Sequence, residues 1–203
     1  MVLVIGVAIA TLLYFPMNHA FARQYTLTVG LDSDLPLIPA FAVPYLLFLP
    51  LFWATVLYSL VTDRGFTQLA LAIIIAYLVS DAIYLVFHTY MPRPEHVSGS
   101  FSGLVHFVYS HDHPYNDFPS EHASSATLLA LFAWRYARRW GWAALVFAVL
   151  VVLGTMFIRQ HSVAGALSGV CLGAAAWVLA APLAARLFGF EPGVQEQSLH
   201  YDR

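Results

Sequence analysis

Two histidines stand at the beginning of apolar segments in this chain. His122 ends the stretch "FPSEH", residues 118–122, and His161 ends "RQH", residues 159–161. Imidazole is a good nucleophile when neutral and a usable acid when protonated, both near neutral pH. Titratable groups next to hydrocarbon are costly and are therefore usually functional. The pair predicts group-transfer chemistry at a membrane surface.

The spacing of the two histidines predicts that they lie on the same side of the membrane. Two apolar stretches separated by "RYARRWGW" lie between them, and two crossings return a chain to the side from which it started. Each histidine then stands at the N-terminus of a helix, where free N–H groups and the helix dipole favour anions. Ser120 is expected to cap the helix that carries His122, with Glu121 in its first turn. These features predict a phosphate site.

Two arginines are candidate phosphate ligands. Arg93 lies between Pro92 and Pro94, which fix the backbone and end the preceding helix. Its guanidinium is therefore suited to bidentate contact with phosphate oxygens. Arg159 precedes His161 by two residues. We expect Arg93, Ser120 and Arg159 to bind phosphate beside the two histidines, with no metal and no cofactor.

The composition identifies the elements that must position these groups. Hydrophobic residues make up 60% of the 203 residues and charged residues 10%, and the mean hydropathy is +0.72. Such a chain is typical of an integral membrane protein. We predict an all-α polytopic membrane helical bundle with six transmembrane helices, in a single domain of residues 1–203 with a polar tail at 191–203. The expected spans are residues 2–22, 37–61, 68–91, 121–138, 142–158 and 162–183.

The arginines predict the orientation, because short cytoplasmic loops carry an excess of positive charge. The predicted cytoplasmic side holds Arg64, Arg135, Arg138, Arg139, Arg186 and Arg203. The other side holds Arg23, Arg93 and Arg159. The site is therefore expected on the non-cytoplasmic face, and the plasma membrane is the expected location. "HAFA" at residues 19–22 resembles a cleavage site, but the first segment has no basic start, which favours an uncleaved anchor.

The remaining composition excludes other classes of protein. A lone cysteine, Cys171, cannot form an internal disulfide. The net charge is −2, lysine is absent and no run of basic residues occurs, so we expect no nucleic-acid partner. The expected partners are the bilayer and a lipid phosphate or lipid diphosphate substrate.

Three motifs together resemble the type 2 phosphatidic acid phosphatase superfamily. They are Arg93-Pro94, "PSEH" at residues 119–122, and His161. The stretches "LDSDLPLIPAFAVPYLLFLPLF" and "YSHDHPYNDFPSEH" look most like the branch of sphingomyelin synthase and inositol phosphorylceramide synthase. The resemblance covers residues 31–173. It implies that His161 attacks phosphorus and that His122 protonates the leaving group.

The chain departs from the family pattern at three positions. Val86 stands where a lysine is expected, Thr155 where an arginine is expected, and Gly165 where a carboxylate is expected one turn after the nucleophile. Without that carboxylate, nothing close in sequence orients His161. Asp81, inside the third span, is the candidate that reaches His161 from a neighbouring helix, and its alternative role is to join helices by hydrogen bonds.

The leading interpretation is a membrane lipid phosphatase that works through a phosphohistidine intermediate. A lipid phosphotransferase and a non-catalytic binder of lipid phosphates remain as alternatives. From a different class, a haem or metal electron carrier would use His88, His122 or His161 as axial ligands. The "HDH" at residues 111–113 is a further candidate for a metal, but no second ligand pair with zinc spacing accompanies it.

Overall fold

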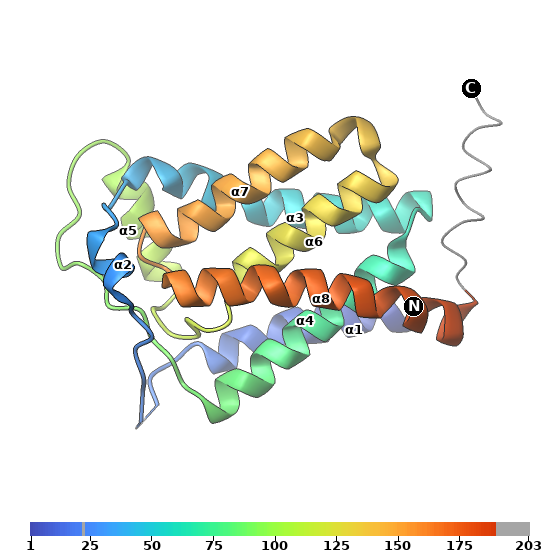
Figure 1. Cartoon of the computed structure of the whole chain (residues 1–203), viewed down its shortest axis with the longest axis horizontal. Coiled ribbons are helices and arrows are strands. Elements are labelled where there is room, and N and C mark those ends of the chain that lie inside the picture. Colours follow the sequence, from blue (N-terminus) through green and yellow to red (C-terminus); the bar gives the residue numbers. More distant parts are fainter. Residues whose placement is uncertain (22, 190–203) are drawn as a thin grey trace.

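The computed structural model describes residues 1–21 and 23–189, and these form helices joined by connections of different lengths (Figure 1). Part of the "HAFA" stretch and the predicted tail at 191–203 lie outside the described residues. Within the described ranges the only β-type pairings are two isolated bridges, Tyr25 with Thr89 and Tyr90 with Tyr115. The prediction of an all-α fold is confirmed.

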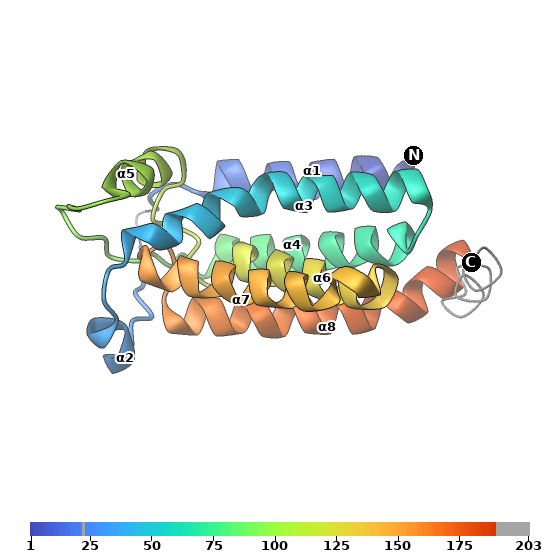
Figure 2. The ribbon, with the colours of Figure 1, turned by 90° about the horizontal axis from the view of Figure 1, so that it is seen from above.

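Six long helices run along the long axis of the molecule, and each runs opposite to the one before it in this set (Figures 1 and 2). They are α1 (Val2–Met17), α3 (Ala42–Thr62), α4 (Phe66–Val86), α6 (Glu121–Tyr136), α7 (Gly141–Phe157) and α8 (Val163–Phe188). Each corresponds to one predicted span. Four shorter elements join them: α2 (Gly30–Asp34), α5 (Ser102–His111) and the 3₁₀ turns Pro39–Phe41 and Arg138–Trp140.

Four of the described helical segments are long and apolar enough to cross a membrane. They are Pro39–Thr62, Phe66–Val86, Arg138–Phe157 and Val163–Phe188. By contrast, α1 and α6 each have 16 residues. At 1.5 Å per residue they extend about 24 Å, less than the roughly 30 Å of a typical hydrocarbon core. The chain is therefore an integral membrane protein by composition and helix length, and the prediction of six spans is supported for four.

Close packing between α6 and α8 brings His122, in the first turn of α6, close to His161, which directly precedes the N-cap of α8. Gly165, Gly169 and Gly173 form a stripe along α8 at four-residue spacing. A Cβ atom added at Gly169 would lie 2.3 Å from the carbonyl oxygen of Ser120, and one at Gly173 would lie 2.4 Å from that of Ser124. Only glycine allows so close an approach between backbones. The small residues of "AGALSGVCLGAAAW" thus set the distance between the two helices.

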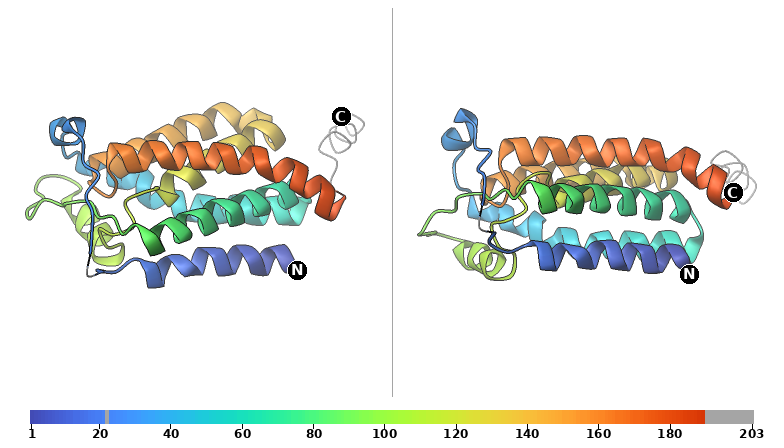
Figure 3. Two further views of the ribbon diagram at one scale, coloured as in Figure 1. Left: turned by 60° about the horizontal axis from the view of Figure 1, so that its bottom comes forward. Right: turned by 90° about the horizontal axis from the view of Figure 1, so that it is seen from below.

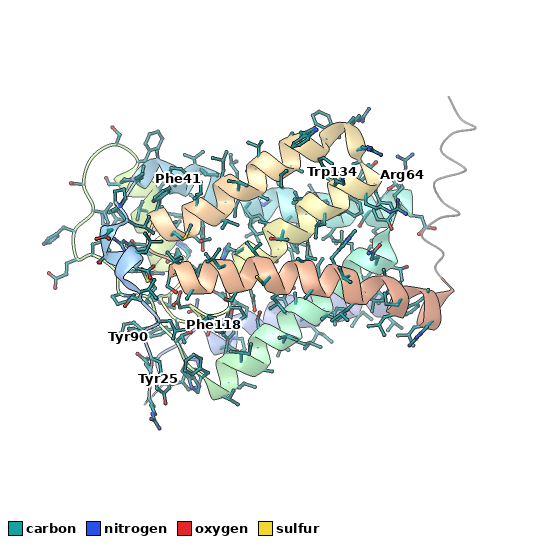
Figure 4. All side chains as sticks on the ribbon, in the orientation of Figure 1. Tyr25, Phe41, Arg64, Tyr90, Phe118 and Trp134 are labelled. Carbon is teal, nitrogen blue, oxygen red and sulfur yellow. The ribbon has the colours of Figure 1, made fainter. Side chains whose placement is uncertain are left out.

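The two ends of the bundle differ in structure. Helices α2 and α5 and the long connections gather at one end, and the tight α3–α4 and α6–α7 turns lie at the other (Figure 3). Arg64 and Trp134 lie toward the end with the tight turns, whereas Phe118, four residues before His122, lies toward the opposite end (Figure 4). Arg64, Arg135, Arg138 and Arg139 thus belong to the end away from the histidines, as the sequence predicts.

Candidate active site

His122 and His161 lie side by side at the starts of α6 and α8. Their ring centroids are 5.9 Å apart. The backbone N–H of Ser120 donates to the carbonyl oxygen of Gly165 at 2.9 Å, which ties the two helix starts to each other. The juxtaposition expected from the two-crossing argument is therefore present, although the residues lie 39 positions apart in the chain.

Ser120 is the N-cap of α6, as predicted. Its hydroxyl oxygen accepts a hydrogen bond from the backbone N–H of Ala123 at 3.2 Å, and its own backbone is extended. A serine cap satisfies one of the free N–H groups of the first turn. The cap fixes where α6 begins and so fixes the position of His122, two residues later.

The ring of His161 is held by the loop that precedes α6. Its Nδ1 lies 3.0 Å from the backbone carbonyl oxygen of Asp117 and 3.8 Å from the carboxylate oxygen Oδ1 of the same residue. A carbonyl oxygen can only accept, so Nδ1 must carry the proton. In the neutral ring this leaves Nε2 with a free lone pair, which is the arrangement that a nucleophilic histidine requires.

Asp117 supplies the carboxylate that the family pattern expects at position 165, where this chain has glycine. A Cβ atom added at Gly165 would lie 2.1 Å from the carbonyl oxygen of Asp117 and 2.8 Å from its Oδ1. The absence of a side chain at Gly165 thus leaves the room that Asp117 fills from a different element. Asp117 could not be predicted from the sequence, because the family pattern places the carboxylate one turn after His161 and the substitute that the sequence suggested was Asp81.

Asp81 does not make the contact expected of it. It is buried on α4, and neither of its carboxylate oxygens has a hydrogen-bond partner within the described part of the chain. The orienting contact with His161 that the sequence suggested for Asp81 is made by Asp117 instead. The alternative role, a hydrogen bond between helices, is not observed for Asp81 either.

The N-terminus of α8 is occupied by carboxylates of the protein itself. Asp117 Oδ1 accepts from the backbone N–H of Ser162 at 2.6 Å, and Asp32 Oδ1 accepts from that of Val163 at 2.8 Å. The Ser162 hydroxyl donates to Asp117 Oδ2 at 2.7 Å and accepts from the N–H of Gly165 at 3.0 Å. Asp117, Asp32 and the Ser162 hydroxyl thus accept from the N–H groups of Ser162, Val163 and Gly165, and phosphate binding at this helix terminus stays a prediction.

Arg159 is directed toward α2. Its guanidinium donates to the backbone carbonyl oxygens of Asp32 and Leu35, at 2.6 Å in the case of Leu35. Arg159 has a positive φ of 56°, in the turn that reverses the chain between α7 and α8. In this structure its contacts hold α2 against that turn, and its role as a phosphate ligand stays a prediction.

Arg93 reaches the residue next to His161. Its guanidinium donates to the side-chain oxygen of Gln160 and to the backbone carbonyl oxygen of Asp112, the latter at 2.6 Å. It also lies over the ring of Tyr109, 4.3 Å from the centroid. Arg93 Nε is buried and has no partner among the described residues. The positive charge of Arg93 is thus fixed beside the histidine pair.

A second carboxylate, Asp112, lies near His122. Side chains of Tyr14, Asn18, Tyr45 and Gln160 all donate to it. Burial alone would raise the pKa of Asp112, but the neighbouring His122 and the hydrogen bonds from Tyr14 and Tyr45 hold that pKa below its ordinary value. Asp112 is therefore anionic. The sequence singled out Asp112 only within a candidate metal motif.

The three residues of the candidate metal motif "HDH" do not point to one place in the structure. His111 and His113 are exposed, whereas Asp112 points to the four donors described above. Residues 1–21 and 23–189 contain no group of three or more His, Cys, Asp or Glu side chains arranged to hold a metal ion. The histidine pair, the carboxylates of Asp112 and Asp117, and Arg93 are ionisable groups of this site.

Comparison with known proteins gives one match. The model of the PAP2 superfamily matches residues 65–188, a region that contains Arg93, Asp117, His122 and His161. No curated protein and no solved structure matches the chain. The family model covers more than half of the chain and spans α4 to α8. The chain belongs to the PAP2 superfamily.

Proposed function

We propose that this chain is a membrane phosphatase that cleaves a lipid phosphate ester or diphosphate through a phosphohistidine at His161. The observation that carries the proposal is the hydrogen bond from His161 Nδ1 to Asp117, which leaves Nε2 as the nucleophilic nitrogen. Membership of the PAP2 superfamily supports action on phosphate-containing substrates. The apolar helices on both sides of the site favour a lipid substrate.

In the first step, the lone pair of His161 Nε2 forms a bond to phosphorus. The bond between phosphorus and the leaving oxygen breaks, and that oxygen takes a proton from protonated His122. The carboxylate of Asp117, 3.8 Å from Nδ1, stabilises the positive charge that develops on the His161 ring. Arg93 and Ser120 are the proposed partners of the phosphate oxygens, and Arg159 would join them only after leaving its contacts with α2.

In the second step, an acceptor replaces His161 on phosphorus. Neutral His122 removes a proton from water or an alcohol, the new oxygen–phosphorus bond forms and the bond to His161 Nε2 breaks. Water as the acceptor makes the enzyme a phosphatase. An alcohol on a second lipid makes it a phosphotransferase, as in the sphingomyelin synthase and inositol phosphorylceramide synthase branch.

We further propose that the site faces the non-cytoplasmic side, with the plasma membrane as its location. The proposal rests on the arginines at the opposite end of the bundle, because positive charge favours cytoplasmic loops. At that side a lipid head group reaches the histidine pair from the membrane surface.

The experiment is a substrate panel with the protein reconstituted in vesicles. We expect release of phosphate from phosphatidic acid, a prenyl diphosphate or a long-chain alkyl phosphate, and unchanged turnover after treatment with EDTA. Ceramide-type phospholipids with a labelled acceptor lipid test the phosphotransferase, whose product is a labelled phospholipid and no free phosphate. Lipid binding without turnover of any member of the panel would contradict both enzymes and favour a non-catalytic binder.

A further inference from the structure

His122 has its own set of supporting side chains, separate from those of His161. The ring of Tyr45, on α3, stacks on the ring of His122 with centroids 4.4 Å apart and an angle of 25° between the planes. The hydroxyl oxygen of Tyr45 lies 3.4 Å from His122 Nδ1, at the long end of hydrogen-bond distances. Tyr45 thus contacts both the face and one nitrogen of the imidazole.

The Tyr45 hydroxyl donates its hydrogen bond to Asp112. Its oxygen lies 2.6 Å from Asp112 Oδ2, and an anionic carboxylate can only accept. The same hydroxyl oxygen accepts from Gln160 Nε2 at 3.2 Å. Toward His122 it can therefore act only as an acceptor, so that Nδ1 of His122 must carry a proton.

This arrangement determines which nitrogen of His122 exchanges protons with the substrate. With Nδ1 protonated in both charge states, Nε2 gains the proton in the imidazolium and loses it in the neutral ring. Asp112 and Tyr45 then support Nδ1 of His122, just as Asp117 supports Nδ1 of His161. The two histidines are each held at Nδ1 and each left free to react at Nε2.

We infer that Tyr45 and Asp112 are positioning residues that prepare His122 as the proton donor to the leaving group. The inference rests on the proposed function. When the bond to the leaving oxygen breaks, the proton moves from His122 Nε2 to that oxygen. The neutral ring keeps the proton on Nδ1, which continues to donate a hydrogen bond to the Tyr45 hydroxyl oxygen. Asp112 does not give up or gain a proton.

The positioning residues come partly from outside the family region. Tyr45 on α3, Tyr14 on α1 and Asn18 directly after α1 all precede the matched residues 65–188. Tyr14 and Asn18 donate to Asp112 Oδ1, whereas Tyr45 and Gln160 donate to Oδ2. All four donors hold the same carboxylate in place, and Tyr45 also stacks on the ring of His122.

The test compares two phosphate monoesters that differ in their need for a proton donor. 4-Nitrophenol leaves readily without protonation, whereas a long-chain alcohol does not. The change is Tyr45→Phe, which keeps the ring that stacks on His122. We expect the variant to lower kcat for the alkyl phosphate roughly 10- to 100-fold. The burst of 4-nitrophenol reports the first step alone, and we expect its rate constant in the variant to stay within about 3-fold of the wild-type value. We also expect KM for both esters to stay within about 3-fold of the wild-type values.

Tyr14→Phe is the matched control, since it removes the hydrogen bond to Asp112 Oδ1, whereas the Tyr45 hydroxyl donates to Oδ2 and lies 3.4 Å from His122 Nδ1. This control is expected to change kcat for the alkyl phosphate and for the 4-nitrophenyl ester by the same factor. Asp112→Asn is the second variant and should show the same preference for the 4-nitrophenyl ester as Tyr45→Phe. Equal losses on both esters in folded Tyr45→Phe and Asp112→Asn proteins would overturn the inference. Failure of the proposed function has a different signature, because wild-type protein would then show no burst with either ester.

Discussion

The Asp117→Asn variant is expected to turn over substrate about 10²- to 10³-fold more slowly than the wild type while keeping its fold. The carboxylate lies 3.8 Å from His161 Nδ1. Two unit charges about 4 Å apart interact by about 4 kcal/mol at an effective dielectric constant of about 20, which corresponds to about a thousandfold in rate. Asparagine keeps the backbone carbonyl that accepts a hydrogen bond from Nδ1, but it removes the charge and disturbs the two hydrogen bonds from Ser162, so a control for helix capping is needed. Steady-state kcat on the best substrate of the panel is the measurement.

Asp32→Asn is the matched control for this variant. Asp32 is also buried and also accepts from a backbone N–H at the start of α8, at 2.8 Å from the nitrogen of Val163. Its carboxylate has no hydrogen bond or ion pair with His161 in the described structure. We expect the Asp32 variant to lower the thermal midpoint but to change kcat by less than about 5-fold. Equal kcat losses in the two variants would show that helix capping, and not the charge beside His161, is what Asp117 provides.

Replacing Gly165 by alanine is expected to remove activity almost completely and to destabilise the protein. A Cβ atom there would lie 2.1 Å from the carbonyl oxygen of Asp117, far inside van der Waals contact. Either the Asp117 loop or α8 must move, and overpacking of this kind costs about 1–3 kcal/mol or more. Because Asp117 holds His161, the displacement is also expected to disorder the proposed nucleophile. Thermal unfolding in detergent and kcat together measure both effects.

Gly165→Asp restores the residue type of the family pattern. We expect this variant to be less stable and less active than Gly165→Ala. The family pattern predicts the opposite if this chain is an impaired version of the family site, namely that a carboxylate at this position preserves or raises turnover. The structure reverses that prediction because Asp117 already fills the space. Gly103→Ala is the matched control, since Gly103 is helical and nothing lies within 4 Å of its added Cβ. An active and stable Gly165→Asp protein would contradict the packing described for α8.

The long helices could be predicted from the sequence because their signal is local. Apolar runs near 20 residues locate them, and the predicted spans 142–158 and 162–183 differ little at their starts from α7 and α8, although α8 continues through Phe188. The predicted third span, 68–91, is too long because α4 ends at Val86 and the chain then extends toward Pro92. Helix α5 was not predicted, since its ten residues lie in a loop whose composition is mixed.

The histidine pair could also be predicted, because the number of crossings between His122 and His161 places both at one end of the bundle. The supporting carboxylates could not. Asp117 and Asp112 come from loops whose course depends on tertiary contacts, and Tyr45 comes from a helix distant in sequence. One signal was available: Gly165 stands where a carboxylate is expected, and a glycine at a packed position indicates that another part of the chain approaches there.

The most direct test of the account is to identify the residue that becomes phosphorylated during turnover. The protein is mixed with substrate, quenched in alkali, in which phosphohistidine survives, and digested for mass spectrometry. The account predicts phosphate on Nε2 of His161, formed as fast as the leaving group is released and missing in the His161→Ala variant. Phosphate on His122, or turnover of substrate with no phosphorylated residue in the burst, would contradict it.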